Sequence, residues 1–239
     1  MKKYILVFLV CISIFSCKKD NNFLPSEKLI KTFNIEHISQ NYEYNEDKNL
    51  SKMIITLGSY YLYEYSDSIV DILVFDKDNN QIESGYLVLN NKGYAKYSYM
   101  YNPIPNDTTY YEYFYDIDDF LIRFNVIGQG YSYSFIYTRD NGNIIKWHRE
   151  YTESWMTEPE ITEKVISYSN VVNYIDFENR GIKFYGKPTP NLPSEEKSGD
   201  LITKFDYNYD NDGSVVRRFG MLYFNNEIID STVINITYY

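Results

Sequence analysis

The stretch "YSYSFIYTRDNGNIIKW", Tyr131–Trp147, decides the fold. Four aromatic residues alternate along its first half: Tyr131, Tyr133, Phe135 and Tyr137. A period of two places alternate side chains on one face of a β-strand. The Asn141-Gly142 pair that follows supplies the positive φ angles that a tight hairpin turn requires. The stretch therefore predicts two antiparallel strands joined by a short turn.

The same plan recurs along the chain. Aromatic residues alternate in "YSYMY" (97–101), "YEYFY" (111–115) and "FDYNY" (205–209), and turns rich in Asn, Asp and Gly lie near residues 79, 92, 141, 180, 212 and 225. Tyrosine numbers 28, and Tyr and Phe favour pleated, half-buried surfaces. No window of comparable length keeps a helical stripe. We therefore expect a mainly β fold with little helix: an antiparallel meander of hairpins forming one large twisted sheet, or an open barrel or sandwich.

The N-terminal residues predict an export signal. Met1 and two lysines precede an apolar run over 4–15, which has the plan of a secretory signal peptide. The run is shorter than the ~20 residues that a transmembrane helix needs. We expect a signal peptide over 1–16, a flexible tether over 17–27 and a single β-rich domain over 28–239.

Residues 14–17, Ile-Phe-Ser-Cys, resemble the lipobox of bacterial lipoproteins. The resemblance implies cleavage before Cys17 and acylation of its sulfur. Cys11, the only other cysteine, lies inside the signal peptide and would be discarded with it. The acyl chains would then hold the protein on a membrane. An ordinary signal peptide with a chance cysteine is the alternative.

Composition excludes several classes of site. With Cys11 removed and Cys17 lipidated, the mature fold has no disulfide, thiolate metal site or cysteine nucleophile. The full chain carries a net charge of −10, which argues against nucleic-acid binding because that function needs clustered Lys and Arg. No cofactor motif is present, so we expect no cofactor.

The C-terminal part, about residues 165–239, carries a closer resemblance and is a possible subunit. It contains Gly186-Lys187, then Asn191-Leu192-Pro193, then the hairpin Tyr207–Gly213, then the final Ile236–Tyr238. This order resembles a domain-of-unknown-function family of outer-membrane lipoproteins in Bacteroides-type bacteria, with tyrosine-aspartate-like hairpin repeats. The resemblance implies a β-rich envelope protein in the outer membrane, facing the periplasm or the cell surface. We expect residues 186–200 to form a surface loop, since they hold three prolines.

Candidates for catalysis and metal binding are weak. His37 and His148 have no second histidine near them in sequence, so they are interpreted as strand residues. Asp116 and Asp118 could lie on one strand face as paired carboxylates, although a turn or a solvated edge explains them better. We predict no catalytic and no metal residues.

One turn weakly resembles a calcium loop. Asn208, Asp210 and Asp212 match the first ligand positions of an EF-hand loop, but Phe219 stands where a bidentate Glu is required. A hairpin turn explains the same residues better, because Asp and Asn bond their own backbone.

Aromatic residues are the remaining candidates for ligand binding. Trp147, Tyr151 and Trp155 could form a platform for sugar rings, although cross-strand aromatic pairs that stabilise a sheet are the simpler interpretation. The sequence thus predicts a lipid-anchored, non-enzymatic binding or scaffold protein. Its expected partners are the membrane, through the anchor, and a glycan or another envelope protein. A hydrolase is the least favoured alternative.

Overall fold

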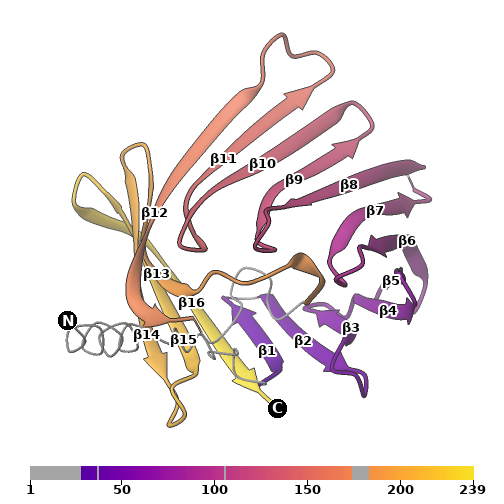
Figure 1. The fold of residues 1–239 in the computed structure, drawn as a ribbon, viewed down its shortest axis with the longest axis horizontal. Coiled ribbons are helices and arrows are strands. Elements are labelled where there is room, and N and C mark those ends of the chain that lie inside the picture. Colours follow the sequence, from indigo (N-terminus) through magenta and orange to yellow (C-terminus); the bar gives the residue numbers. More distant parts are fainter. Residues whose placement is uncertain (1–27, 37, 105, 174–182) are drawn as a thin grey trace, which may run out of the picture.

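Sixteen antiparallel strands form a closed barrel in the computed structural model (Figure 1). The structure describes residues 28–36, 38–104, 106–173 and 183–239. Each strand pairs with its sequence neighbours, and β1 pairs with β16 to close the ring. The strands are β1 (Ile30–Ile35), β2 (Ile38–Tyr44), β3 (Leu50–Ile55), β4 (Tyr60–Ser66), β5 (Ile69–Phe75), β6 (Gln81–Leu89), β7 (Ala95–Asn102), β8 (Asp107–Tyr115), β9 (Leu121–Gly128), β10 (Tyr131–Asp140), β11 (Asn143–Glu153), β12 (Glu160–Val172), β13 (Asn191–Ser198), β14 (Leu201–Tyr209), β15 (Val215–Phe224) and β16 (Glu227–Tyr238), with one 3₁₀ turn, η1 (Lys183–Tyr185).

The predicted antiparallel meander with little helix is confirmed. The sheet closes fully, whereas the sequence allowed an open form. Closure depends on the pairing of β1 with β16, for example Phe33 with Ile236, and no local pattern reveals a contact between the two ends of the chain. Among the described residues, no helix is long and apolar enough to cross a membrane.

The turns follow from their Asp, Asn and Gly residues. Asp76, Asn90, Asp116 and Asp210 each accept two backbone N–H bonds, from the residues two and four positions later. This local bonding fixes each chain reversal. Asn141 and Gly142 both have positive φ, as the sequence predicted for the β10–β11 turn. The predicted turn near residue 180 lies outside the described residues.

Strand register separates an inner face from an outer face. In β5, Val70, Ile72 and Val74 are buried, whereas the alternate residues Ile69 and Asp71 are exposed. The strand neighbours continue this division around the ring, because residues directly opposite one another share a face of the sheet. The hydrophobic core therefore lies inside the barrel.

The expected surface loop over 186–200 is wrong in its second half. Asn191–Ser198 forms β13, which pairs with both β12 and β14. Pro193 is tolerated because it lies opposite Tyr168 at an irregularity in the β12–β13 register, where a ladder hydrogen bond is already interrupted. Within this segment, only residues 186–190 and the turn at 199–200 lie outside a strand.

The first described residues and the C-terminal residue lie together at one end of the barrel, called the tether end here. β1 begins there and β16 ends there, and the Tyr239 N–H donates to the Leu29 carbonyl. Lys28 Nζ lies 3.0 Å from Asp210 and 2.8 Å from Asp212, in the β14–β15 turn. These bonds hold the first described residue against the β14–β15 turn. The predicted signal peptide, Cys17 and the tether itself lie outside the described residues.

Candidate functional site

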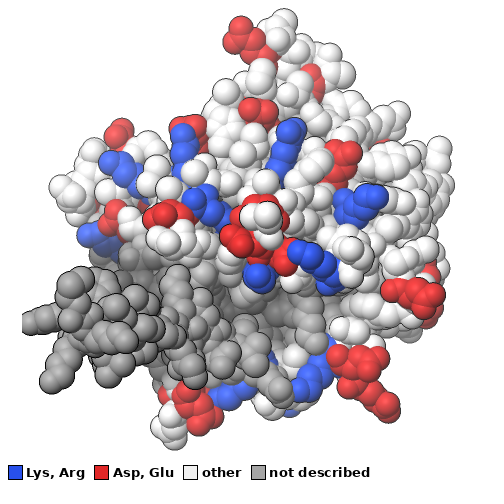
Figure 2. All heavy atoms as spheres, in the orientation of Figure 1, with Lys and Arg blue, Asp and Glu red and all other residues white. Residues whose placement is uncertain are grey.

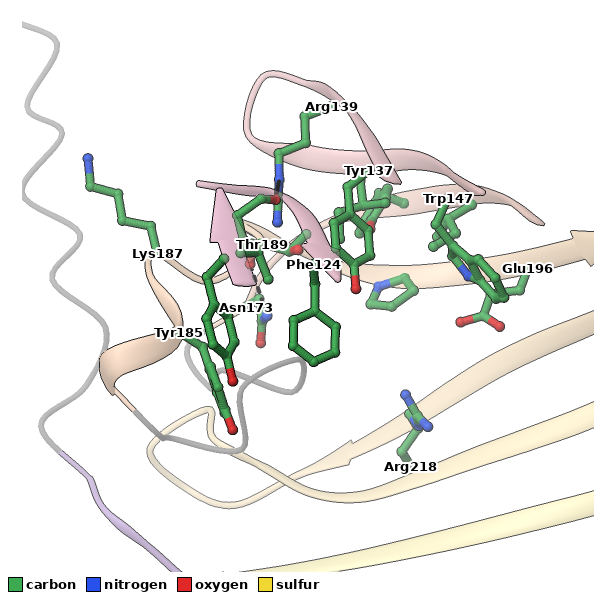
Figure 3. A pocket seen from close by; sticks show the side chains of 16 residues that line it. Phe124, Tyr137, Arg139, Trp147, Asn173, Tyr185, Lys187, Thr189, Glu196 and Arg218 are labelled. Atoms are coloured by element: carbon green, nitrogen blue, oxygen red, sulfur yellow. Dashed lines mark hydrogen bonds between the residues drawn. The ribbon is translucent and has the colours of Figure 1, made fainter. Parts of the chain in front are cut away.

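A cavity of about 460 Å³ lies inside the barrel, against the inner faces of β8–β13 and β15 (Figure 3). Its walls are mainly aromatic and aliphatic, with a few charged and amide groups. Its volume falls within the ~300–1,000 Å³ of typical small-molecule sites. It is lined by Tyr113, Leu121, Phe124, Tyr137, Arg139, Ile144, Trp147, Ile166, Tyr168, Asn173, Tyr185, Lys187, Thr189, Pro193, Glu196 and Arg218.

A row of aromatic rings crosses four neighbouring strands along one wall. The ring centroids of Tyr113 and Phe124 are 5.0 Å apart, those of Phe124 and Phe135 6.0 Å, and those of Phe135 and Trp147 6.1 Å. These separations fit stacked and tilted aromatic pairs. The sequence predicted such cross-strand pairs. The row also presents flat apolar faces to the cavity, at Tyr113, Phe124 and Trp147.

Charged side chains lie next to Trp147, at the β11 end of the aromatic row. Lys164 Nζ lies 5.3 Å from the centre of the Trp147 ring and 3.2 Å from Glu196. Arg218 reaches the cavity from β15, with its guanidinium 4.8 Å from the Phe205 ring. Burial lowers the pKa of the Arg218 guanidinium, whereas Tyr207 and Glu196 act in the opposite direction. An arginine nevertheless keeps its charge in proteins, so Arg218 brings a positive charge to the apolar cavity.

Arg139 holds the other side of the cavity together. Its Nε donates to the Leu121 carbonyl at 3.1 Å and its Nη1 to the Gly142 carbonyl at 2.6 Å. The guanidinium also lies 5.0 Å from the Phe120 ring. Arg139 therefore links β9, β10 and the β10–β11 turn, and adds a second positive charge to the lining.

The described residues between β12 and β13, Asn173 and residues 183–190, form the floor of the cavity. Figure 1 shows residues 183–190 crossing the inside of the ring of strands. Tyr185 packs 5.8 Å from Tyr113, and Asn173 donates to the buried Thr189 carbonyl at 2.9 Å (Figure 3). Gly186 has φ +92°, and a Cβ there would lie 2.7 Å from the Tyr115 ring. Only glycine fits this approach, so the floor packs closely against β8.

A second cavity of about 530 Å³ adjoins the aromatic row toward the opposite, distal end of the barrel. It is lined by Val126, Gln129, Gly130, Tyr131, Tyr133, Phe135, Tyr151 and Glu153. Gln129 and Gly130 form the β9–β10 turn at the distal end. Phe124 lines the first cavity and Phe135 the second, and the two rings stack on each other.

The predicted platform of Trp147, Tyr151 and Trp155 is only partly assembled. Trp147 and Tyr151 share the inner face of β11, but they line different cavities. Tyr151 stacks on Tyr133 with centroids 4.6 Å apart, and its hydroxyl donates to Glu153. Trp155 lies in the β11–β12 turn, 75% exposed, and its indole N–H donates to Glu153. Tyr151 and Trp155 therefore meet at Glu153, apart from Trp147.

The other candidates lie away from the cavities. His37 falls outside the described residues. His148 lies on the outer face of β11, bonded to Glu150 and Glu163, whose hydrogen bonds raise its pKa. Asp116 and Asp118 lie in the β8–β9 turn and not on a strand face, because Asp116 accepts the Asp118 N–H.

The residues of the weak calcium candidate form a hairpin turn. One Asp210 oxygen accepts backbone N–H groups of Asp212 and Ser214, and the other accepts a bond from Lys28. Asn208 belongs to β14. Within the described part of the chain, no three His, Cys, Asp or Glu residues gather in a metal-binding group.

The outer face carries a polar belt across the middle of β8–β11. Glu112, Asn125, Ser134 and Glu150 are successive cross-strand neighbours. Asn125 donates to Glu112 at 2.8 Å, and Ser134 donates to Asn125 at 3.0 Å. Figure 2 shows acidic and basic side chains intermixed over one face of the molecule. Transmembrane barrels have an outward apolar band about 25 Å tall and a polar interior. On β8–β11 of this barrel, the polar belt interrupts an outer face that also exposes Tyr110, Phe114 and Ile127.

Comparison with known proteins shows a likeness of fold. No family model and no curated protein sequence match the chain. A porin-like protein from Bacteroides uniformis aligns with a TM-score of 0.67 and 14% identity, over 88% of this chain and 98% of its own. A porin-like protein from Bacteroides vulgatus aligns with a TM-score of 0.58 and 14% identity, over 89% and 99%. The barrel is porin-like in fold. At this identity the likeness extends no further, and the resemblance to the lipoprotein family stays a prediction.

Sequence reasoning missed the charged residues of the cavity. Arg139, Glu196 and Arg218 belong to separate hairpins that only barrel closure brings together. One signal was available in the sequence. Arg139 continues the alternating series that ends at Tyr137, and Arg218 lies opposite Tyr207 of the alternating series in the same hairpin. A basic residue in phase with aromatics indicates a charged group on the packed face.

Proposed function

We propose that this protein is a non-enzymatic binding protein of the cell envelope, which holds a small molecule with a flat apolar body inside its barrel. The observation that carries the proposal is the cavity walled by Tyr113, Phe124 and Trp147 inside a closed barrel. Concave, mostly apolar sites with a few placed polar groups are the usual form of ligand pockets. The polar belt on the outer face supports a barrel that lies in water and argues against a membrane channel.

The proposal includes the lipid anchor at Cys17. Ten residues separate Cys17 from Lys28, so an extended tether would reach at most about 35 Å. Lys28 is bonded to the β14–β15 turn at the tether end, where the floor segment also lies. An anchored barrel would therefore turn its tether end toward the membrane and its distal cavity, beside Gly130 and Glu153, toward the surrounding water.

The test of binding uses the tryptophan in the cavity wall. The barrel closes entirely within residues 30–238, so the chain from residue 18 onward is suited to the measurement. Trp155→Phe leaves Trp147 as the sole tryptophan. Titration with the neutral probe N-phenyl-1-naphthylamine should quench Trp147 by energy transfer and saturate near one probe per chain. Absence of saturable quenching would overturn the proposal. In the control variant Trp147→Phe, the exposed Trp155 should be quenched less.

Lipidation is tested separately in cells that process bacterial lipoproteins. Radiolabelled palmitate should be incorporated into the wild-type chain and not into Cys17→Ala. Label that persists in Cys17→Ala would contradict the anchor and leave the binding proposal in place.

A second function, glycan binding, is favoured by one observation on the outer face. Tyr86, Tyr99 and Tyr110 are cross-strand neighbours on β6–β8, with successive ring centroids 5.5 Å apart, and Tyr86 and Tyr110 are 38% and 49% exposed. Such a row could stack on successive sugar rings. A glycan array should show binding by the wild-type barrel that Tyr110→Ala removes, and no binding to any polysaccharide would eliminate this function.

A further inference from the structure

We infer that the outer tyrosine row binds a glycan whose sugars carry free amino groups, and that Asp71 and Glu64 hold one of its ammonium groups. The row consists of Tyr86, Tyr99 and Tyr110, which are cross-strand neighbours on the outer face of β6–β8. The inference rests on the second function proposed above and adds the chemical class of the glycan. The net charge of −10 of the chain favours the approach of a cation.

Two carboxylates continue the tyrosine row. Asp71 lies directly opposite Tyr86, and Glu64 lies directly opposite Asp71. Both acidic residues are exposed. Because residues opposite one another share a face of the sheet, one cross-strand line runs over β4–β8 from two acids to three tyrosines. At its other end Tyr110 lies opposite the uncharged Ile127, so the line has an acidic end and an apolar end.

The acidic pair has no counter-ion in the part of the chain that the structure describes, where no ion pair involves Glu64 or Asp71. Lys52 lies opposite Leu62, two positions before Glu64, but its ammonium lies 4.9 Å from the centre of the Tyr60 ring. Like charges directly opposite one another destabilise a sheet. A bound cation would offset this repulsion, and the charge of the face therefore selects a cationic partner.

The tyrosines favour a sugar chain as the body of this cation. Their hydroxyls have no hydrogen-bond partner among the described residues, and their successive ring centroids are 5.5 Å apart. A phenolic hydroxyl both donates and accepts hydrogen bonds, which matches the hydroxyl groups repeated along a glycan. The faces of tyrosine rings also attract ammonium groups. A chain of amino sugars therefore fits both the tyrosines and the acidic pair.

A matched pair of sugar chains tests the charge. The hexamer of β-1,4-linked glucosamine and its fully N-acetylated counterpart share one skeleton, and the acetyl groups remove the charge of the amines. At mildly acidic pH the free amines are protonated, while Asp and Glu side chains stay ionised. In isothermal titration calorimetry, the wild-type barrel, residues 18–239, should bind the glucosamine hexamer at least about tenfold more tightly than the acetylated hexamer.

Two double variants separate the acidic pair from the overall charge. Glu64→Gln combined with Asp71→Asn should remove most of the preference and bind the acetylated hexamer as the wild type does, which also shows that the variant is folded. Asp200→Asn combined with Asp206→Asn is the control, because both residues are exposed and lie in the β13–β14 turn and in β14. The control removes the same number of charges and should keep the preference. Tyr110→Ala should weaken the binding of both hexamers.

The outcomes separate the inference from the function on which it rests. Loss of the preference in the variant of Glu64 and Asp71, and not in the control, supports the inference. Equal binding of the two hexamers by the wild type, or an equal loss in the control, overturns the amino sugar and leaves glycan binding standing. A lysine hexapeptide that competes as well as the glucosamine hexamer overturns the sugar and assigns the row to a basic peptide. If neither hexamer binds, the inference fails, and the glycan array decides whether glycan binding fails with it.

Discussion

Along β8–β11, successive side chains point alternately to the inner and the outer face of the barrel, and the two faces carry different residues at the middle of these strands. On the inner face, Phe124 and Phe135 stack across neighbouring strands beside the cavities. On the outer face, Asn125, which follows Phe124, accepts a hydrogen bond from Ser134, which precedes Phe135; both belong to the polar belt. The difference shows that an aromatic row inside the barrel and a polar belt outside it alternate along the same strands, in a barrel whose fold is porin-like.

The largest expected effect comes from removing an inner ring. Phe124→Ala deletes the centre of the aromatic row and should lower the free energy of unfolding by about 3 kcal/mol. Phe114→Ala is the matched change on the outer face, where the side chain is 43% exposed, and should cost about 1 kcal/mol or less. Urea denaturation measures both values. Equal losses in the free energy of unfolding for the two variants would contradict a packed inner face and an exposed outer face.

The floor of the cavity is tested at Gly186. Gly186→Ala forces a Cβ against the Tyr115 ring and the Asp119 carbonyl at a positive φ, and should cost about 2 kcal/mol. Gly213→Ala is the control, since its φ is also positive but no atom lies within 4 Å of the added Cβ. Thermal unfolding should therefore show a larger loss for Gly186→Ala. A loss no larger than that of Gly213→Ala would mean that the floor does not pack against β8.

The two tryptophans report on the interior and the surface separately. Trp155→Phe leaves Trp147 in the cavity wall, and Trp147→Phe leaves Trp155, which is 75% exposed. Quenching by acrylamide should be severalfold weaker for the variant that keeps Trp147. Similar quenching constants would contradict a closed interior around Trp147.

The smallest expected effect is the pH dependence of an outer-face cluster. The carboxylates of Glu163 and Glu150 accept hydrogen bonds from the protonated His148 ring and thereby raise the pKa of His148. A raised folded pKa adds stability below the unfolded value near 6.5, and this stability is lost as the pH rises through the folded pKa. The wild type should therefore be slightly more stable at pH 6 than at pH 8.5, by well under about 1 kcal/mol because the pair is solvated. His148→Gln should remove the difference, and an unchanged pH profile in that variant would assign the dependence to other groups.

The sequence predicted the strands better than it predicted the site. Period-two aromatic sets identified β7, β8, β10 and β14, and Asn and Gly identified their turns. The period does not say which face is inside. The tyrosines around Tyr99 lie outside, while those around Tyr133 lie inside, because both faces carry aromatic residues.

Cavity residues were predictable only where they belonged to an aromatic pattern. Trp147 was singled out as a ligand residue and lines the cavity. Glu196 lies in β13 and Arg218 in β15, both far from Trp147 in the sequence. No local spacing therefore connects these residues with Trp147. The strand β13 was missed because Pro193 suggests a loop, and the register irregularity that accommodates it is a property of the paired sheet.

Sedimentation velocity without detergent tests the central claim most directly, that the aromatic row lies inside the barrel and the polar belt on the outer face of β8–β11 meets water. Residues 18–239 should sediment in plain buffer as a single compact species, with the β-sheet signature retained in circular dichroism. Aggregation that only detergent reverses, together with spontaneous insertion into lipid vesicles, would contradict the account and indicate a barrel that spans the membrane.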